Sequence, residues 1–361
     1  MDNLKEIISI FDIPEKVTEV GPMGEGMIND TYKVFVEGFT KPKYVLQRIN
    51  NAVFQDVDML QDNIEKVTNH IRVKGKNTLK FFHTKQSDKT YYFDGEKYWR
   101  LMLFVPDSIT YQTINANYSY LAGKSFGEFE FLLSDLKEPI GEIIPNFHNI
   151  EFRLQQLRDA VVEDRVGRVK LPEVKYYLNE IEKRADKMTL GERLFREGKL
   201  PKRICHCDTK VNNMLFDNNG DVLCIIDLDT VMPSFVFSDY GDFLRDAANT
   251  GAEDDSNLDN IDFNMEIFES FTKGYLEGTK DFLLPIEKEN LPYAVLLFPY
   301  MQTVRFLADY INGDPYYKIK YPEHNLVRTR AQWRLFEKVE EKEDLLRKYI
   351  LTLSLQHLIM D

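Results

Sequence analysis

The spacing of hydrophobic residues differs between the first hundred residues and the rest of the chain. Over the first hundred residues apolar positions come in short runs between turn residues, and we predict strands at Val17–Gly21, Thr31–Val36, Tyr44–Ile49, Leu79–His83, Tyr91–Phe93 and Tyr98–Val105. One segment, Asp56–Val73, instead has apolar residues at the 3.6-residue spacing of a helix. Asp94-Gly95 is a hairpin turn signal. This part of the chain therefore predicts a small antiparallel sheet with one main helix.

Beyond Pro106 the period becomes helical. We predict helices at Asn117–Leu136, Glu151–Glu163, Glu173–Glu197, Tyr240–Asn249, Asp262–Leu276, Lys288–Ile311 and Glu323–His357. One hairpin interrupts them, with two short strands around Asn218-Asn219-Gly220. The predicted fold class is α+β with two lobes. An N-terminal sheet lobe spans residues 1–105, a hinge lies near Val105–Ser108, and a larger helical lobe spans residues 106–361.

Composition excludes several classes of function. The 361 residues carry a formal net charge of −13, so we expect no general binding to nucleic acid. No apolar run approaches the ~18 residues of a membrane span, so no membrane partner is expected. Met1–Pro14 lacks the basic start and cleavage site of a secretory signal. Three cysteines are an odd number, which favours reduced thiols in a cytosol. We expect a cytoplasmic monomer or weak homo-oligomer.

The most informative segment has the pattern His-x-Asp-x-Lys-x-x-Asn and runs from His206 to Asn213. An apolar strand and the predicted hairpin follow, and Asp227 ends the returning strand, so the hairpin brings Asn213 and Asp227 together. Phosphoryl transfer from ATP needs such a set: a carboxylate that orients the attacking hydroxyl, a cation near the moving phosphoryl group, and hard oxygen ligands for Mg²⁺. Asp208 is the candidate base, Lys210 the charge stabiliser, and Asn213 and Asp227 the metal ligands.

Other interpretations of these residues carry less weight. Asp208, Asn213 and Asp227 could be turn residues around a hairpin, which Asn and Asp favour. A zinc site at Cys205 and Cys207 lacks a second ligand cluster at zinc spacing. An Asp-x-Asp motif of glycosyltransferases normally follows a nucleotide-binding βαβ array, which this chain lacks. We interpret His206 as a residue that holds the loop by hydrogen bonding.

Candidate nucleotide contacts lie in the first hundred residues. Two glycines between predicted strands suit a flap over phosphates, and the end of the last strand suits a hinge beside the adenine. Protein kinases place a phosphate-binding Lys on the third strand, where this chain offers a Gln instead. The candidates are Gly24, Gly26, Gln47, Leu103, Phe104 and Val105.

Several blocks resemble the N-acetylhexosamine 1-kinases, within the aminoglycoside phosphotransferase and choline kinase-like superfamily of protein-kinase-like folds. The superfamily shares the His206–Asn213 motif, and the block most specific to the subfamily is Lys320–Arg330. The blocks spread over nearly the whole chain: Gly24–Tyr32, His206–Asn213, Ile225–Pro233, Asp239–Asp242, Arg305–Tyr310 and Lys320–Arg330.

The resemblance implies that ATP phosphorylates the anomeric hydroxyl of N-acetylglucosamine or N-acetylgalactosamine to the α-1-phosphate, in amino sugar salvage. It places Asp229, Arg305 and Tyr316, with Asp208, in contact with the sugar. From the residues alone, Arg305 could equally pair with Asp309 one turn on, and Tyr316 could be a core aromatic. Met27 stands where the hexosamine kinases carry a His, and this leaves the preference among hexoses open.

Two further functions remain possible on the same fold. Another small-molecule kinase would act on homoserine, choline or a methylthiosugar. A pseudokinase would hold nucleotide without transfer, and the intact Asp208, Asn213 and Asp227 argue against it.

Overall fold

The computed structural model describes residues 2–23, 29–111, 113–279 and 282–360. The chain forms two compact units. The first contains residues 1–111, 132–145 and 212–232, and the second contains residues 112–131, 146–211 and 233–361. Beyond residue 105, where the sequence suggested a boundary, the unit that holds the sheet also contains residues 106–111, 132–145 and 212–232.

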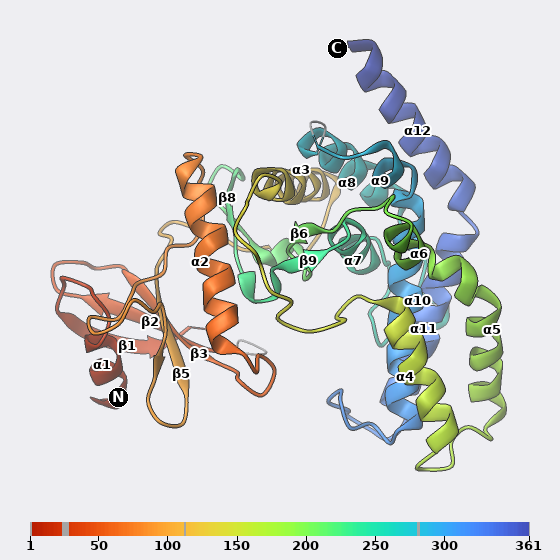
Figure 1. The fold of residues 1–361 in the computed structure, drawn as a ribbon, viewed down its shortest axis with the longest axis horizontal. Coiled ribbons are helices and arrows are strands. Elements are labelled where there is room, and N and C mark those ends of the chain that lie inside the picture. Colours follow the sequence, from red (N-terminus) through yellow and green to blue (C-terminus); the bar gives the residue numbers. More distant parts are fainter. Residues whose placement is uncertain (1, 24–28, 112, 280–281, 361) are drawn as a thin grey trace. The chain divides into compact units, whose positions relative to one another are not determined.

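The first unit is built on a five-stranded antiparallel sheet (Figure 1). Its spatial order is β1-β2-β3-β5-β4. The short N-terminal helix α1 packs Ile7 and Ile8 into the core beneath the sheet. These elements are α1 (Asp2–Ser9), β1 (Val17–Pro22), β2 (Asp30–Val36), β3 (Tyr44–Ile49), β4 (Tyr92–Phe93) and β5 (Tyr98–Leu103).

One predicted strand is not continuous. Leu79–His83 forms only an isolated bridge, between Phe81 and Met102. Its backbone makes two bonds to β5, from Phe82 N–H to the Leu101 carbonyl and from Leu103 N–H to the Lys80 carbonyl. Two bonds align the segment with the sheet edge without forming a regular ladder.

Helix α2 (Val57–Val73) ties the added segments to the sheet unit. Asp56 caps its first turn by accepting a hydrogen bond from Met59 N–H at 2.9 Å. The buried Asn63 side chain donates to the carbonyls of Gly141, at 2.8 Å, and Val231, at 3.2 Å. A long-range polar contact of this kind carries no local sequence signal.

The hairpin β7 (Met214–Phe216) and β8 (Val222–Ile225) also belongs to the first unit. Its turn is the predicted one: Asp217 N–H bonds to the Asp221 carbonyl, and Gly220 takes the left-handed conformation at φ 89°. Phe216 exchanges two backbone hydrogen bonds with Ile109, at 2.8 and 2.9 Å.

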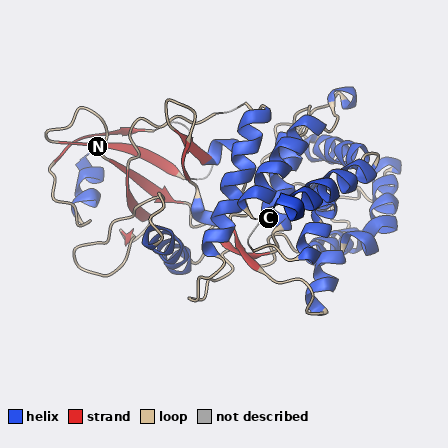
Figure 2. Cartoon of the chain, turned by 90° about the horizontal axis from the view of Figure 1, so that it is seen from above, coloured by secondary structure: helices blue, strands red, loops and turns tan. Residues whose placement is uncertain are grey.

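The second unit is mostly helical (Figure 2), with α10 packed against α4, α7 and α11. The short strands β6 and β9 pair with each other. The elements are α3 (Ala116–Leu133), α4 (Ile150–Glu163), α5 (Pro172–Met188), α6 (Leu190–Arg196), β6 (Arg203–Cys205), β9 (Met232–Ser234), α7 (Phe237–Ala247), α8 (Met265–Gly278), α9 (Pro285–Glu289), α10 (Leu291–Ile311), α11 (His324–Glu340) and α12 (Glu343–Met360).

Three predicted helices are each divided in two. Glu173–Glu197 breaks at Thr189, where the Tyr293 hydroxyl donates to the Met188 carbonyl at 2.6 Å and accepts from Gly191 N–H at 3.2 Å. A side chain from a distant helix therefore takes the place of a helical bond. Lys288–Ile311 breaks at Asn290, and Glu323–His357 breaks at Glu341 and Lys342.

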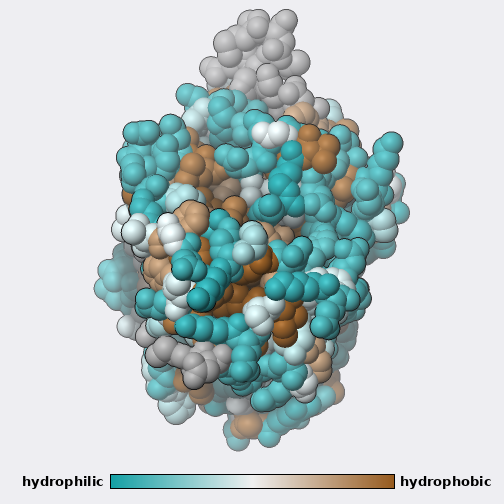
Figure 3. All heavy atoms as spheres, turned by 90° about the vertical axis from the view of Figure 1, so that its left-hand side faces the viewer, coloured by the Kyte–Doolittle hydropathy of each residue, from teal (hydrophilic) through white to brown (hydrophobic). Residues whose placement is uncertain are grey.

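The surface is mostly polar, as expected for a sequence rich in charged residues. Polar residues make up most of the face seen in Figure 3, and hydrophobic residues gather in patches between them. Within the described part of the chain, none of the helices combines the length and the apolar character that crossing a membrane requires.

Candidate functional site

The loop after β6 is fixed by one buried carboxylate. Asp239, on α7, accepts hydrogen bonds from the backbone N–H groups of His206 and Cys207, each at 2.7 Å. Its carbonyl accepts from the Thr209 hydroxyl at 2.8 Å. Cys207 takes the left-handed conformation, with φ 63°, which a non-glycine residue keeps only when its surroundings hold it. Asp239 therefore sets the shape of the loop that carries Asp208.

Asp208 and Lys210 form an ion pair at 2.7 Å, with both side chains partly exposed. Desolvation acts to lower the pKa of Lys210, but the Asp208 carboxylate outweighs it and raises that pKa. Asp208 N–H donates to His206 Nδ1 at 3.3 Å, and His206 is fully buried. As the sequence predicts, His206 holds the loop, whereas the carboxylate and the ammonium reach its surface.

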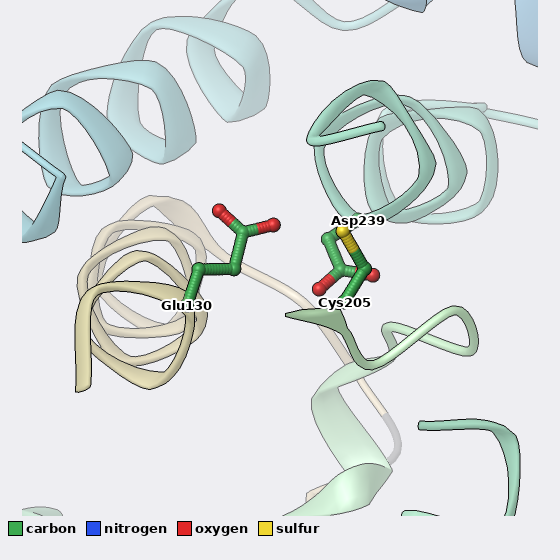
Figure 4. A group of neighbouring side chains, drawn as sticks. All are labelled: Glu130, Cys205 and Asp239. Carbon is green, nitrogen blue, oxygen red and sulfur yellow. The ribbon is translucent and has the colours of Figure 1, made fainter. Parts of the chain in front are cut away.

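Glu130, Cys205 and Asp239 form a buried cluster behind this loop (Figure 4). Glu130 comes from α3, Cys205 from β6 and Asp239 from α7, and their ligand atoms lie within 4.8 Å of one another. Burial, followed by the charge of Asp239, raises the pKa of Glu130 well above its usual range.

This cluster is a hydrogen-bonding network. Tyr275 Oη donates to Glu130 Oε2 at 2.6 Å, and the Cys205 thiol points at the Phe235 carbonyl at 3.4 Å. Burial raises the pKa of Cys205 well above its usual range, which favours the neutral thiol. The cluster supports the loop that carries Asp208.

The proposed metal ligands lie at one end of the β7–β8 hairpin. Met214 pairs with Ile225, and Ile226 N–H donates to the Asn213 carbonyl at 2.9 Å. This bond brings Asn213 next to the residue before Asp227, as the sequence predicts. Asp227 adopts the left-handed conformation, φ 58° and ψ 57°, which ends the strand and starts a short 3-10 turn, Leu228–Thr230. Asn and Asp tolerate this conformation better than most residues.

The four residues divide between the units. Asp208 and Lys210 belong to the second unit, and Asn213 and Asp227 belong to the first. The division falls within the same loop, between Val211 and Asn212.

Gln47 and Asp229 share one buried cation that sequence reasoning missed. Arg100 on β5 pairs across the sheet with Gln47 on β3, and both its Nε and Nη2 donate to Gln47 Oε1, at 2.9 and 2.7 Å. Its Nη1 and Nη2 face the two carboxylate oxygens of Asp229, at 2.5 and 3.0 Å. Asn29 Nδ2 donates to Asp229 Oδ2 at 2.7 Å. A guanidinium thus stands on the strand next to the position where kinases carry a lysine.

The other nucleotide candidates are only partly described. Gly24 and Gly26 lie outside the described residues. Leu103 ends β5, and Phe104 N–H donates to the Lys43 carbonyl at 2.9 Å. The Val105 carbonyl accepts from the Ser108 hydroxyl at 2.8 Å, which turns the chain at the predicted hinge.

Arg305 and Tyr316 lie in the second unit. Arg305 donates to Gln302 Oε1 at 3.2 Å, and the alternative pairing with Asp309 does not form. Asp309 instead accepts from the backbone N–H groups of Tyr316, at 2.9 Å, and Tyr317, at 3.0 Å. Tyr316 is 69% exposed, and it is the neighbouring Tyr317 ring that lies 5.7 Å from the Arg305 guanidinium.

The segment Lys320–Arg330 stabilises this loop. Asn325 Nδ2 donates to Asp309 Oδ2 at 2.8 Å and to Asp314 Oδ1 at 2.9 Å. His324 Nε2 lies 2.8 Å from Asp254. Asn325 therefore helps to hold the segment that carries Tyr316 and Tyr317.

Comparison with known families agrees with this arrangement. Residues 19–270, more than half of the chain, match the phosphotransferase enzyme family. The chain belongs to this family. The matched range contains all but the first two residues of the sheet, the Asp208 loop and the β7–β8 hairpin.

Solved structures share the fold over nearly the whole chain. An aminoglycoside phosphotransferase from Alicyclobacillus acidocaldarius subsp. acidocaldarius is 14% identical with a TM-score of 0.61, covering 96% of this chain and 96% of that chain. Choline kinase LicA from Streptococcus pneumoniae is 14% identical with a TM-score of 0.55, covering 94% and 98%. Amicoumacin kinase hAmiN, in complex with AMP-PNP, Ca²⁺ and Ami, is 14% identical with a TM-score of 0.57, covering 94% and 93%. This phosphotransferase therefore has the kinase-like α+β fold, as its sequence predicts.

Proposed function

We propose that this phosphotransferase is a Mg²⁺- and ATP-dependent sugar kinase. It would transfer the γ-phosphoryl group to the anomeric hydroxyl of N-acetylglucosamine or N-acetylgalactosamine, in the salvage of amino sugars. The proposed phosphoryl transfer is supported mainly by the Asp208–Lys210 pair. This pair lies on a loop whose backbone is held by the buried Asp239.

Asp208 would orient the acceptor hydroxyl and accept its proton as the new oxygen–phosphorus bond forms and the bond to the leaving ADP breaks. Lys210 would offset the negative charge around the base and the moving phosphoryl group. An anomeric hydroxyl is more acidic than an ordinary alcohol, so a carboxylate of modest basicity suffices. Positioning and charge neutralisation then supply most of the rate.

Asn213 and Asp227 would hold the magnesium. One amide and one carboxylate oxygen at one end of a rigid hairpin are hard donors of the kind Mg²⁺ takes, beside phosphate oxygens and water. The bound ion would neutralise the phosphates and fix their orientation. Gly24, Gly26, Gln47 and the segment Leu103–Val105 remain our proposed nucleotide contacts.

The sugar assignment rests on the resemblance to the hexosamine kinases. Arg305, Tyr316 and Asp229 are its proposed sugar contacts. Arg100 and Asn29 make three hydrogen bonds to Asp229, which leaves one of the about four acceptor positions of a carboxylate for a sugar hydroxyl. We therefore expect Asp229 to contribute less to sugar binding than Arg305.

An ADP-release assay with Mg-ATP tests the proposal. The panel contains N-acetylglucosamine, N-acetylgalactosamine, glucose, galactose, choline and homoserine, together with the 1-O-methyl glycoside of any sugar that reacts. We expect turnover of an N-acetylhexosamine that disappears when O1 is methylated. Turnover that survives methylation would place the acceptor at another hydroxyl. Turnover of choline or homoserine alone would overturn the sugar assignment and keep the kinase.

A further inference from the structure

Three arginines of the second unit, Arg153, Arg305 and Arg328, lie partly buried around one tyrosine, Tyr317. Within the described part of the chain, none of the three forms an ion pair, and they donate only to carbonyl and amide oxygens. Most other arginines of this acidic protein pair with a carboxylate, as Arg158 on the same helix α4 does with Glu182. Unpaired guanidinium groups are therefore concentrated at one place.

Aromatic rings bring these cations together. The Arg305 guanidinium carbon lies 5.6 Å from the Phe147 ring centre and 5.7 Å from that of Tyr317. The Arg328 guanidinium carbon lies 5.9 Å from the Tyr317 ring centre. Arg153 donates twice to the Phe147 carbonyl, at 3.2 and 2.8 Å. They come from α4, α10 and α11, and α10 packs against the other two (Figure 1).

The carboxylates that could neutralise them are already engaged. Asp309, one turn after Arg305, accepts from the backbone of Tyr316 and Tyr317. Glu253, whose charge acts on Tyr317, pairs with Arg245 at 2.9 Å. The protein therefore does not use its own nearby acids to balance this cluster.

Polar atoms in the same cluster also lack partners. Among the described residues, the Tyr317 hydroxyl, Arg328 Nε and His148 Nδ1 are buried without a hydrogen bond. Each such atom is costly to bury, and native proteins rarely keep several close together without a reason. The His148 ring stacks on Phe147, with 4.3 Å between ring centres, which places it in the same cluster.

The charges of the arginines act on one another and on His148. Burial, followed by the charge of Arg305, lowers the pKa of Arg153 to about 10. Burial, and then Arg305 and Arg153, also lower the pKa of His148 well below its usual range, so this ring is neutral. A neutral ligand would leave the repulsion between the arginines in place, whereas an anion would remove it.

We propose that Arg153, Arg305 and Arg328 bind an anionic group, a phosphate or a carboxylate, on the acceptor molecule. The inference rests on the proposed function in one respect, that the acceptor is an N-acetylhexosamine; it adds that the preferred acceptor is an acidic derivative of that sugar. The planar fork of Arg matches both groups in a bidentate manner. The Tyr317 hydroxyl would donate a further hydrogen bond to the same anion.

Isothermal titration without nucleotide separates binding from catalysis. The probes are N-acetylglucosamine, its 6-phosphate, and N-acetylmuramic acid, which carries a carboxylate. We expect at least one acidic sugar to bind roughly tenfold to a hundredfold more tightly than the neutral one, as charge-assisted hydrogen bonds allow. The two acidic probes decide between phosphate and carboxylate.

Matched variants locate the effect. Arg305→Gln and Arg153→Gln should each reduce the preference for the acidic sugar by about tenfold or more. Arg158→Gln, which removes a paired arginine from the same helix as Arg153, should keep it. Tyr317→Phe removes a single oxygen and should weaken acidic binding even if the arginine variants do not fold.

Two results would overturn the anion site: equal binding of neutral and acidic sugars by the wild type, or equal loss of preference in Arg158→Gln and Arg305→Gln. Turnover then separates the two proposals. Acidic sugars that bind tightly through the arginines without being phosphorylated would refute the acceptor role and keep the site. Neutral hexosamines that react while acidic ones bind no better would support the kinase and refute the site.

Discussion

Arg100 and Asp229 form a buried ion pair between residues 129 positions apart in the chain. Their side chains are 3% and 4% exposed, and two guanidinium nitrogens face two carboxylate oxygens. The pair links strand β5 to the turn that begins at Asp227, the proposed metal ligand. Arg100 also donates to Gln47 on β3, and Asn29, directly before β2, donates to Asp229, so the pair is connected to these two segments as well.

We expect Arg100→Met to destabilise the protein by about 3–5 kcal/mol, because removing one partner leaves a buried charge uncompensated. Urea unfolding followed by circular dichroism measures the change. Arg48→Met is the matched control on the neighbouring strand, since Arg48 pairs with Asp30 in a more exposed position and should cost ~0–1 kcal/mol. Equal losses in the two variants would contradict a specific role for the buried pair.

Glu130 makes the stability of the folded protein depend on pH in a predictable direction. Burial and the neighbouring Asp239 raise the pKa of Glu130, so the folded protein holds a proton that the unfolded chain releases near pH 4.5. Between the unfolded and folded pKa values, stability therefore falls as pH rises, by at most about 1.4 kcal/mol per unit.

Glu130→Gln removes this titration and keeps the shape of the protonated side chain. We expect the variant to gain stability relative to the wild type as the pH rises from 5 to 8. Urea unfolding of both proteins at several pH values measures the difference. A constant difference across this range would mean that Glu130 is ionised in the folded state.

Local patterns explain what the sequence could predict. The β7–β8 hairpin follows from Asn218-Asn219-Gly220 and the apolar strands on either side, and it brings Asn213 to the residue before Asp227. The helix Val57–Val73 falls within the segment Asp56–Val73 that the apolar spacing predicts. Each of these features depends on residues within one turn or one hairpin of each other.

Polar contacts between distant residues explain most of the features that the sequence could not predict. The break in the helix at Thr189 depends on the hydroxyl of Tyr293. The ion pair of Asp229 depends on Arg100, which in the sequence looks like an ordinary polar residue of a strand. The placement of Tyr317 rather than Tyr316 beside Arg305 depends on how Asp309 folds the intervening loop. The partners in the first two contacts stand 105 and 129 positions apart in the sequence.

Asp208→Asn tests the proposed base. The amide keeps an oxygen that can accept from Lys210, so the loop should keep its shape while the proton acceptor is lost. We expect kcat to fall by about 10²–10⁴-fold with sugar binding nearly unchanged. Steady-state ADP release and sugar titration measure the two effects. Asp186→Asn, at a position with a 96% exposed side chain on α5, is the control and should keep full activity. A variant of Asp208 that retained most of its turnover would exclude it as the base.

Asp227→Asn tests the proposed metal ligand without disturbing the backbone. Asn tolerates the left-handed conformation that Asp227 adopts, whereas Ala would add strain of about 1 kcal/mol or more. Loss of the carboxylate charge should remove most of the gain in ATP affinity that Mg²⁺ provides, because the cation then has one neutral amide oxygen in place of a charged ligand. ATP titrations in Mg²⁺ and in EDTA measure that gain. Asp221→Asn, at an exposed position of the same hairpin, should leave it intact. If Asp227→Asn and Asp221→Asn bound Mg-ATP equally well, the magnesium ligand would have to be sought elsewhere.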